Sequence, residues 1–390
     1  MLEVKSHFSS TVARPGAPLH FAAHSHHPWP DVTFKAQQTA WLDAAALLDR
    51  KWGKVFGEVI PEAQQHIASR LSLPDPTSIV FGPNTHSFLL RILSCTRSGS
   101  AINVISTDGE FHSFTRQMDR LVEARLVNLV RVPVEPFATF KSRFIDALRK
   151  GKDWDIVWLS HVFFNSGWVL PHNDLVDILN AIPSAGTIAV IDGYHAFMAI
   201  PVDLSGIGAR AFYVAGGYKY AMAGEGACFL HCPPNYGPRP RDTGWYAEFG
   251  ALEAARGDQV AFGKDGSRFA GATFDPSGIY RLNAVMRWMD ALGLTVFDMD
   301  GHCLELQKQF VTQLDAARCN LSSQDLVVRD VDLCGRFLTF QTPDAKRLDT
   351  ELAGNDIVVD HRGDRLRIGF GIYQDAGDVD RLVGVLKAVA

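Results

Sequence analysis

The hydrophobic pattern of the chain alternates between two periods. From about residue 84 to residue 232, short runs of consecutive apolar residues are separated by segments whose apolar residues recur at helical spacing. Consecutive apolar residues are typical of strands that are buried on both faces. Strands are therefore expected at 100–107, 155–162 and 186–192, and helices at 84–95, 111–126 and 139–150. This order predicts an α/β fold with a mostly parallel, doubly wound sheet.

The pattern changes after residue 232. The stretch 232–273 is rich in Pro, Gly and charged residues and lacks periodicity, which predicts loops at an active site or an interface. Helices and strands then alternate again, which predicts a smaller C-terminal α/β domain. Its strands are expected at 325–331, 336–342 and 365–370, and its helices at 279–292, in the run after it, at 344–353 and at the C-terminus.

Three parts of the chain are expected. Residues 1–45 form an N-terminal arm that contributes to the active site and to the small domain. Residues 46–285 form the large domain, and residues 286–390 form the small one.

The most informative residues are Asp192 and Lys219. Asp192 ends the apolar run GTIAVID, and a buried carboxylate needs a cationic partner or it stays protonated. Lys219 lies between Tyr218 and Tyr220 in a Gly-rich apolar stretch, where desolvation lowers the pKa of an amine. A lysine that binds an aldehyde and an aspartate that keeps a pyridine nitrogen protonated are the two groups that a pyridoxal phosphate enzyme needs.

Composition excludes several other classes of protein. The chain has 390 residues, of which 47% are hydrophobic, and a formal net charge of −5, so it can bury a large core and has no basic surface for nucleic acid. No apolar stretch approaches the length of a membrane span, and we expect a cytoplasmic protein. The six cysteines are scattered and are expected to be reduced.

Several motifs resemble those of a known family. The segment from Ile191 to Gly226 resembles the Asp-x-x-His and Lys signature of the class V aminotransferases, which have the type I fold of pyridoxal phosphate enzymes. Within that group, the Tyr-Lys-Tyr followed by a Gly-rich stretch is similar to that of kynureninases. The C-terminal IVVDHRGDRLRIGFGIY is also similar to their pattern. The resemblance runs from about residue 20 to about residue 385.

The resemblance implies contacts to the cofactor. Asn84 and Thr85 would bind its phosphate at a helix N-terminus, where an ordinary N-cap is the alternative. Tyr218 would be a second phosphate ligand, or else a core aromatic. Phe111 would stack on the ring, or else lie in the core. His195 would hydrogen-bond Asp192 or the cofactor, or else be a satisfied core histidine.

Two further contacts are implied in the loop region. Thr273 resembles the Gly-Thr that reaches the phosphate of the neighbouring subunit, which implies a homodimer with shared active sites. Trp245 is similar to a tryptophan that lies near the cofactor in kynureninases.

Arg367 is the expected ligand of the substrate carboxylate, because a guanidinium binds a carboxylate in a bidentate manner. Arg365 shares its face of the expected strand, so a structural ion pair is the alternative for either residue. Arg362 and Asp360 are interpreted as a structural pair.

The segment FAAHSHHPWPD raises a separate question. His24 and His26 would share a face if they lay on a strand, and a metal site there is conceivable. The family places a substrate-lining Asn-Ser element here, so His24 and Ser25 are expected to contact substrate, and no metal is assigned.

Together these features predict a pyridoxal phosphate enzyme that acts on a small α-amino acid, with Lys219 as the base for the α-proton. Elements that shape the aryl pocket of kynureninases are missing, which favours amino transfer, with hydrolytic Cβ–Cγ cleavage as the alternative. Cysteine desulfurases place a nucleophilic cysteine shortly before the C-terminal Arg strand, and residues 352–367 contain none. Desulfurase chemistry is therefore disfavoured. A non-catalytic binding protein is the remote alternative.

Overall fold

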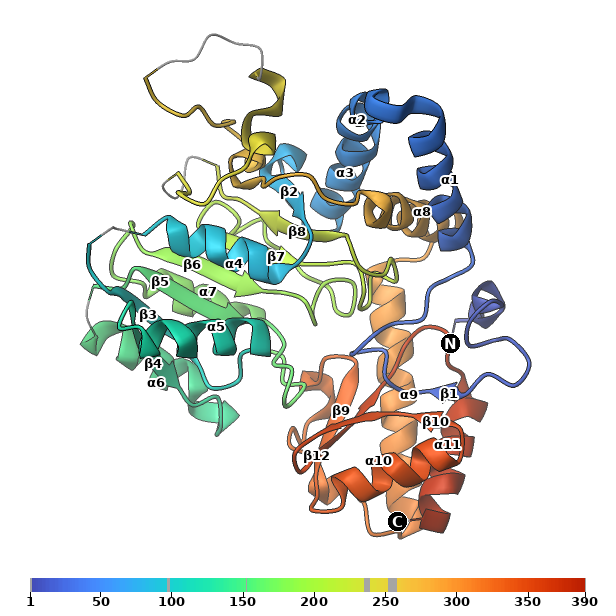
Figure 1. Cartoon of the computed structure of the whole chain (residues 1–390). Coiled ribbons are helices and arrows are strands. Elements are labelled where there is room, and N and C mark those ends of the chain that lie inside the picture. Colours follow the sequence, from blue (N-terminus) through green and yellow to red (C-terminus); the bar gives the residue numbers. More distant parts are fainter. Residues whose placement is uncertain (1, 97–98, 152, 235–238, 252–257, 390) are drawn as a thin grey trace.

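The computed structural model describes residues 2–96, 99–151, 153–234, 239–251 and 258–389. Two lobes are visible in Figure 1: one contains the large sheet, and the other contains the C-terminal strands and helices. Helix α8 (Ser277–Leu292) packs in the first lobe, and helix α9 (Val296–Ala317) runs from its end into the second lobe (Figure 1).

The large lobe is built on a seven-stranded sheet of order β2-β8-β7-β6-β5-β3-β4. Strand β8 is antiparallel to both of its neighbours, and all other pairs are parallel. The mostly parallel α/β fold is thus confirmed. The strands are β2 (Ile79–Gly82), β3 (Ile102–Thr107), β4 (Val127–Val132), β5 (Ile156–Ser160), β6 (Ile188–Asp192), β7 (Ala211–Ala215) and β8 (Cys228–His231).

The central strands are apolar throughout because helices cover both faces of the sheet. In β5, Val157 and Leu159 face one core cluster, whereas Ile156 and Trp158 face the other. Helices α4 (Thr85–Ser94) and α5 (His112–Glu123) pack on the second face. The first face is covered by α3 (Ile60–Arg70), α6 (Phe140–Lys150), α7 (His172–Asn180) and α8. Helix α1 (Val32–Leu47) packs along α8, and the short α2 (Lys51–Lys54) follows it.

The small lobe contains an antiparallel sheet of order β11-β12-β9. These strands are β9 (Phe337–Gln341), β11 (Asp360–Arg362) and β12 (Arg365–Gly369), and they pack with α9, α10 (Ala345–Gly354) and α11 (Ala376–Val389). The N-terminal segment joins this lobe, because β1 (Leu19–His20) pairs in parallel with β10 (Ile357–Val358). The segment after β1 is thereby brought to the boundary between the lobes.

One expected strand is wrong. Residues 325–331 form no strand, and only Leu326 makes an isolated bridge, to Phe340. Aspartate side chains cap short helical turns here in place of strand hydrogen bonds. Asp325 completes a capping box with Ser322, and Asp330 accepts from the Asp332 N–H. Such side chains satisfy the backbone locally and compete with strand pairing.

The expected three-part division remains a prediction, and its boundary at residue 285 falls inside α8. Residues 235–238 and 252–257 of the expected loop stretch lie outside the described residues. No helix in the described ranges combines the length and the apolar character needed to cross a bilayer.

The packing at the end of β7 generates a stability prediction. A Cβ atom on Gly216 would overlap the phenol ring of the buried Tyr194, whereas one on the exposed Gly206 would meet nothing within 4 Å. Gly216→Ala should therefore lower the free energy of unfolding by about 1 to 3 kcal/mol, since an overpacked core must shift. Gly206→Ala is the matched control and should change it by less than about 1 kcal/mol. Denaturant titration measures both, and equal stability of the two variants would contradict the packing described.

Candidate active site

Lys219 lies at the centre of the candidate site. It follows β7 in a buried Gly-rich loop, and its Nζ donates a hydrogen bond to the carbonyl oxygen of His24 at 2.6 Å. Burial lowers the pKa of its amine to about 7, helped by the positive charge of Arg367 and opposed by the carboxylates of Asp192 and Asp360. A substantial fraction of the amine is therefore neutral near pH 7, and a neutral amine is nucleophilic.

Asp192 is the last residue of β6, next to Lys219 along the sheet edge. Its Oδ1 accepts from the Tyr194 N–H at 3.0 Å, and no ion pair to it forms among the described residues. Burial raises the pKa of this carboxyl to about 6, although the Tyr194 N–H and the charge of Lys219 oppose the change. A cation placed here would be stabilised because the carboxylate lacks one.

One pocket brings together most of the expected cofactor contacts. It lies where the carboxyl ends of β5 and β6 meet the loop after β7 and the start of α4, the usual ligand position in such sheets. Its walls include seven expected residues: Asn84, Thr85, Phe111, Asp192, His195, Tyr218 and Lys219.

The start of α4 supplies an anion site. Asn84 is the N-cap, since its side chain accepts from the Ser87 N–H at 3.0 Å, so the ordinary capping role is present. Thr85 is the first helical residue and also lines the pocket. Free N–H groups at a helix start, together with the helix dipole, favour a phosphate.

Two rings that could have been core residues lie at the pocket. The Phe111 side chain is 36% exposed and meets Phe164 edge to face at a centroid distance of 5.4 Å. The imidazole of His195 is buried, and its Nδ1 lacks a hydrogen-bond partner within the described part of the chain. Burial and the charge of Lys219 lower its pKa well below the usual value, so the ring is neutral.

Arg367 does not line the pocket but lies behind its wall, with its guanidinium 6.0 Å from the ring centroid of the lining residue Phe164, and it is already engaged. Its Nε donates to Asp360 Oδ1 at 2.7 Å, its Nη2 pairs with Asp360 Oδ2, and its Nη1 donates to the Phe164 carbonyl at 2.6 Å. A guanidinium carries five N–H donors, so two remain. Arg365 makes structural contacts instead, to the Asn165 carbonyl and to Glu135.

The expected Arg362–Asp360 ion pair is present only at a long distance. The Arg362 Nη2 lies 3.6 Å from the Asp360 carboxylate, which instead holds Arg367. Burial alone would raise the pKa of Asp360, but the hydrogen bond from His24 and the charge of Arg367 lower it overall.

The histidine segment forms a turn, so His24 and His26 do not share a strand face: His24 is fully buried and His26 is exposed. His24 carries the carbonyl that holds Lys219, and its Nε2 lies 3.1 Å from Asp360. Ser25 contacts only His26 by its side chain, at 3.3 Å, among the described residues. No group of three potential metal ligands occurs within the described ranges.

Trp245 and Thr273 lie outside the pocket of their own chain. The Trp245 ring packs on Tyr246 and Phe249, and neither Trp245 nor Thr273 is among the residues that line the pocket. The role expected for Thr273 concerns a neighbouring subunit and remains a prediction.

Sequence reasoning missed Glu110 and Ser160. The carboxyl group of Glu110 accepts from the Ser160 N–H at 3.1 Å and from the Thr107 hydroxyl at 2.7 Å, and it lies 2.6 Å from the Ser160 hydroxyl. Burial raises the pKa of Glu110 to about 8, so it is largely protonated near pH 7. Its position directly before Phe111 in DGEFHSF was the available signal.

Pyridoxal phosphate fits these residues. A helix start offers N–H groups to a phosphate, Asp192 lacks a cation, Lys219 offers a nucleophilic amine, and His195 Nδ1 lacks a partner. These are the groups that the phosphate, ring nitrogen, aldehyde and ring hydroxyl of that cofactor require.

Comparison with known proteins supports the same assignment. A probable cysteine desulfurase of Vibrio cholerae is 25% identical over 343 residues, which cover 84% of this chain and 82% of the relative. A solved mutant of C-DES, with glycine covalently linked to its PLP cofactor, has a TM-score of 0.81 at 16% identity and covers 98% of this chain and 99% of its own. The complex of the cystine C–S lyase C-DES with cysteine persulfide has a TM-score of 0.80 at 17% identity and covers 96% and 98%. These structural likenesses establish the fold.

The family itself is identified by sequence. The aminotransferase class V family matches residues 30–382, which is most of the chain. The relatives compared above are a probable cysteine desulfurase and the cystine C–S lyase C-DES, so the kynureninase-like placement remains a prediction. The chain belongs to the aminotransferase class V family and is a pyridoxal-phosphate-dependent enzyme.

Proposed function

We propose that this enzyme cleaves the Cβ–S bond of a sulfur-containing α-amino acid such as cystine, without a thiol nucleophile of its own. Support comes from the relatives, which are named as a probable cysteine desulfurase and a cystine C–S lyase. Amino transfer, which the sequence favoured, is not confirmed, since none of these relatives carries that activity in its name.

The observation that carries the proposal is the pocket's lack of a thiol. All six cysteines are in the described part of the chain, and none lines the pocket. Cys228 is buried against Tyr194 and Thr85, and burial raises the pKa of its thiol to about 12. Cys334 is buried beside the carbonyls of Val328 and Asp330, with its pKa likewise raised to about 12. Sulfur would therefore leave with the product instead of passing to an enzyme thiolate.

The residues of the pocket have distinct proposed roles in binding the cofactor and in proton transfer. Bound there, pyridoxal phosphate supplies an electron sink for the electrons left at Cα. The start of α4, with Thr85 and Tyr218, would hold its phosphate, Asp192 its ring nitrogen, and Phe111 one face of its ring. His195 would hydrogen-bond the ring hydroxyl. Lys219 would attach the aldehyde and remove the α-proton once substrate displaces it.

Arg367 is proposed to bind the substrate carboxylate through its two remaining N–H donors. Asp360 and the Phe164 carbonyl fix the plane of the guanidinium, so little rotational entropy is lost on binding. The Nε2 of His24 contacts the same Asp360 oxygen, Oδ1, as the Arg367 Nε does.

A direct activity measurement tests the proposal. Cystine and water should give pyruvate, ammonia and cysteine persulfide, because elimination at Cβ breaks one C–S bond and water releases the nitrogen. Lys219→Ala should lower the rate by at least about 1,000-fold, since the base is lost. Cys334→Ser is the matched control and should retain activity. Loss of sulfur release in Cys334→Ser would contradict the thiol-free route.

The same assay separates the alternatives. A transaminase would exchange amino groups between an amino acid and a keto acid and release no sulfur. A hydrolytic Cβ–Cγ enzyme would release an anthranilate and alanine from kynurenine. Either result, without persulfide from cystine, would reject the C–S lyase assignment.

The lowered pKa of Lys219 generates a pH prediction. Capture of pyridoxal phosphate by cofactor-free protein should accelerate as pH rises through about 7, because only the neutral amine reacts. Arg367→Gln removes a positive charge that lowers this pKa, so the midpoint should move to higher pH. Arg365→Gln is the matched control, since its guanidinium is held by Asn165 and Glu135. Stopped-flow absorbance gives the midpoint, and a wild-type value near that of free lysine would refute the assignment.

We also propose a homodimer with shared active sites, as the position of Thr273 suggests. Helix α1 packs along α8 on one side and exposes an apolar stripe on the other: Phe34, Trp41 and Leu42, followed by Leu48, are each more than half exposed. A stripe of this kind typically marks a protein interface. A second copy would cover it.

Disrupting this stripe tests the dimer. The double variant Phe34→Ser/Trp41→Ser should raise the dimer dissociation constant on the order of 100-fold or more, because large aromatic side chains dominate interface energies. Leu126→Ser changes a similarly exposed apolar residue elsewhere and should have no effect. Light scattering after gel filtration gives the mass, and a monomeric wild-type enzyme would reject the proposal.

A further inference from the structure

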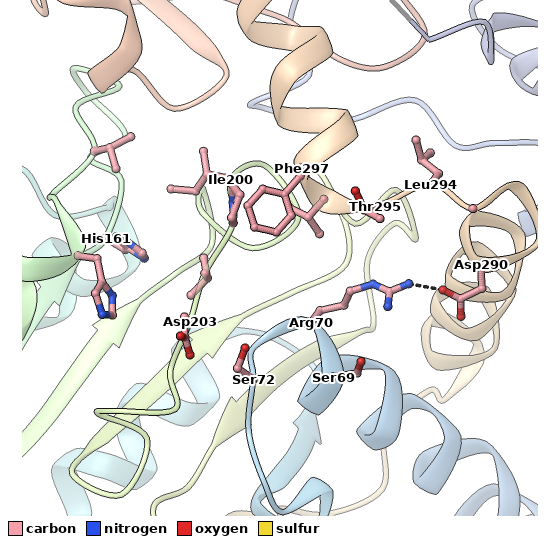
Figure 2. Close-up of a pocket in the computed structure, with 16 residues that line it drawn as sticks. Ser69, Arg70, Ser72, His161, Ile200, Asp203, Asp290, Leu294, Thr295 and Phe297 are labelled. Atoms are coloured by element: carbon pink, nitrogen blue, oxygen red, sulfur yellow. Dashed lines mark hydrogen bonds and ion pairs between the residues drawn. The ribbon is translucent and has the colours of Figure 1, made fainter.

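A second cavity lies apart from the cofactor pocket and shares no lining residue with it. Its volume is about 710 Å³. Figure 2 shows it between the end of α3, the segment 200–203 and the junction of α8 with α9. Because the α8–α9 junction links the two lobes, the walls of the cavity come from both sides of the inter-lobe connection.

The walls are mainly apolar. The large lobe contributes Val169 and the segment Ile200–Val202, and the junction contributes Leu294, Val296 and Phe297. Phe297 is 72% exposed, although an aromatic side chain of this size buries a large apolar area when covered. An apolar ligand in the cavity would shield this ring from water.

His161 provides a polar group in this apolar setting. Its side chain is 4% exposed, and its Nδ1 is buried without a hydrogen-bond partner within the described ranges. A buried ring nitrogen that is left unpaired costs free energy. A ligand with a hydroxyl or carbonyl group would give the imidazole a partner.

The charged groups at the cavity are largely neutralised by one another. Arg70 pairs closely with Asp290, as Figure 2 shows, and the Nδ1 of His66 lies 3.8 Å from the same carboxylate. The remaining lining carboxylate, Asp203, is exposed and accepts from the Ser205 N–H at 2.8 Å. Among the residues that the structure describes, no unpaired Lys or Arg lines the cavity to attract an anion.

We propose that this cavity binds a small, uncharged, mostly apolar molecule whose hydroxyl or carbonyl group hydrogen-bonds to His161. Its volume lies within the range of small-molecule sites, about 300 to 1,000 Å³. Apolar walls with a small number of polar groups are the usual composition of such sites. An anionic ligand would meet the exposed carboxylate of Asp203, whereas Arg70 is already paired with Asp290.

Calorimetric titration of the holoenzyme with 2-naphthol tests the proposal. This probe is an apolar ring system with one hydroxyl group, and naphthalene-2-carboxylate is its anionic counterpart. One molecule of 2-naphthol should bind per chain, with a dissociation constant on the order of 0.1 mM for a molecule of this size. The anion should bind at least 5-fold more weakly. Tighter binding of the anion would overturn the ligand class.

Variants test the location. Ser69→Phe adds a ring at an exposed wall position on α3 and should weaken 2-naphthol binding at least 10-fold by filling the cavity. Phe297→Ala and His161→Phe should each weaken it about 5-fold, the first by loss of apolar contact and the second by loss of the hydrogen bond. Leu126→Ala is the exposed control and should bind as wild type does.

Folding of each variant is checked by its cofactor absorbance and thermal unfolding. If Ser69→Phe and Phe297→Ala are folded and bind the probe as wild type does, the cavity is not the site. Absence of saturable binding to the wild-type enzyme would also overturn the proposal.

Discussion

Two ionisable groups of opposite charge, Lys219 and Asp192, are buried at one sheet edge without forming an ion pair with each other. Burial lowers the pKa of the amine to about 7 and raises the pKa of the carboxyl to about 6. Direct pairing would stabilise both charges, but it would also consume the groups that the cofactor needs. The carbonyl of His24 and the N–H of Tyr194 hold them apart instead. The remaining features of the site depend on this separation.

Several other features of the structure follow from the separation of Lys219 and Asp192. The edge must lie where parallel strands end, so that Asp192 and the loop of Lys219 are neighbours. Gly216 and Gly193 cannot be replaced by larger residues without a shift, because Tyr194 and Tyr213 fill the space where their Cβ atoms would lie. Burying two ionisable groups away from water costs free energy. This cost is offset when a bound cofactor supplies a cation to the carboxylate and an aldehyde to the amine.

Local sequence was sufficient to predict strands β3, β5 and β6 and to single out Asp192 and Lys219, which the structure brings to one pocket, because apolar runs and the residues that end them are visible over short stretches of sequence. Strands β2 and β4 of the same sheet were not expected. Contacts between distant segments were not predictable in this way. Arg367 pairs with Asp360, although the sequence predicted a free guanidinium, and the buried Glu110 is hydrogen-bonded to Ser160. Both contacts depend on side-chain directions that only the assembled fold determines. The expected strand at 325–331 failed for a local reason, since Asp325 and Asp330 cap short turns there.

The pairing of β1 with β10 has a consequence for the order of events during synthesis. Leu19 emerges from the ribosome early, but its partner Ile357 is made close to the end of the chain. Until then the segment that carries the His24 carbonyl has no strand to fix it, and Asp360, which contacts the His24 ring, has not been made. Contacts between the two ends of a chain form late because they close the longest loop. A nascent chain should therefore complete its large sheet, with the cofactor pocket, well before Asp360 can position Arg367 for substrate. A ribosome that stalls before residue 357 would leave a folded but inactive lobe.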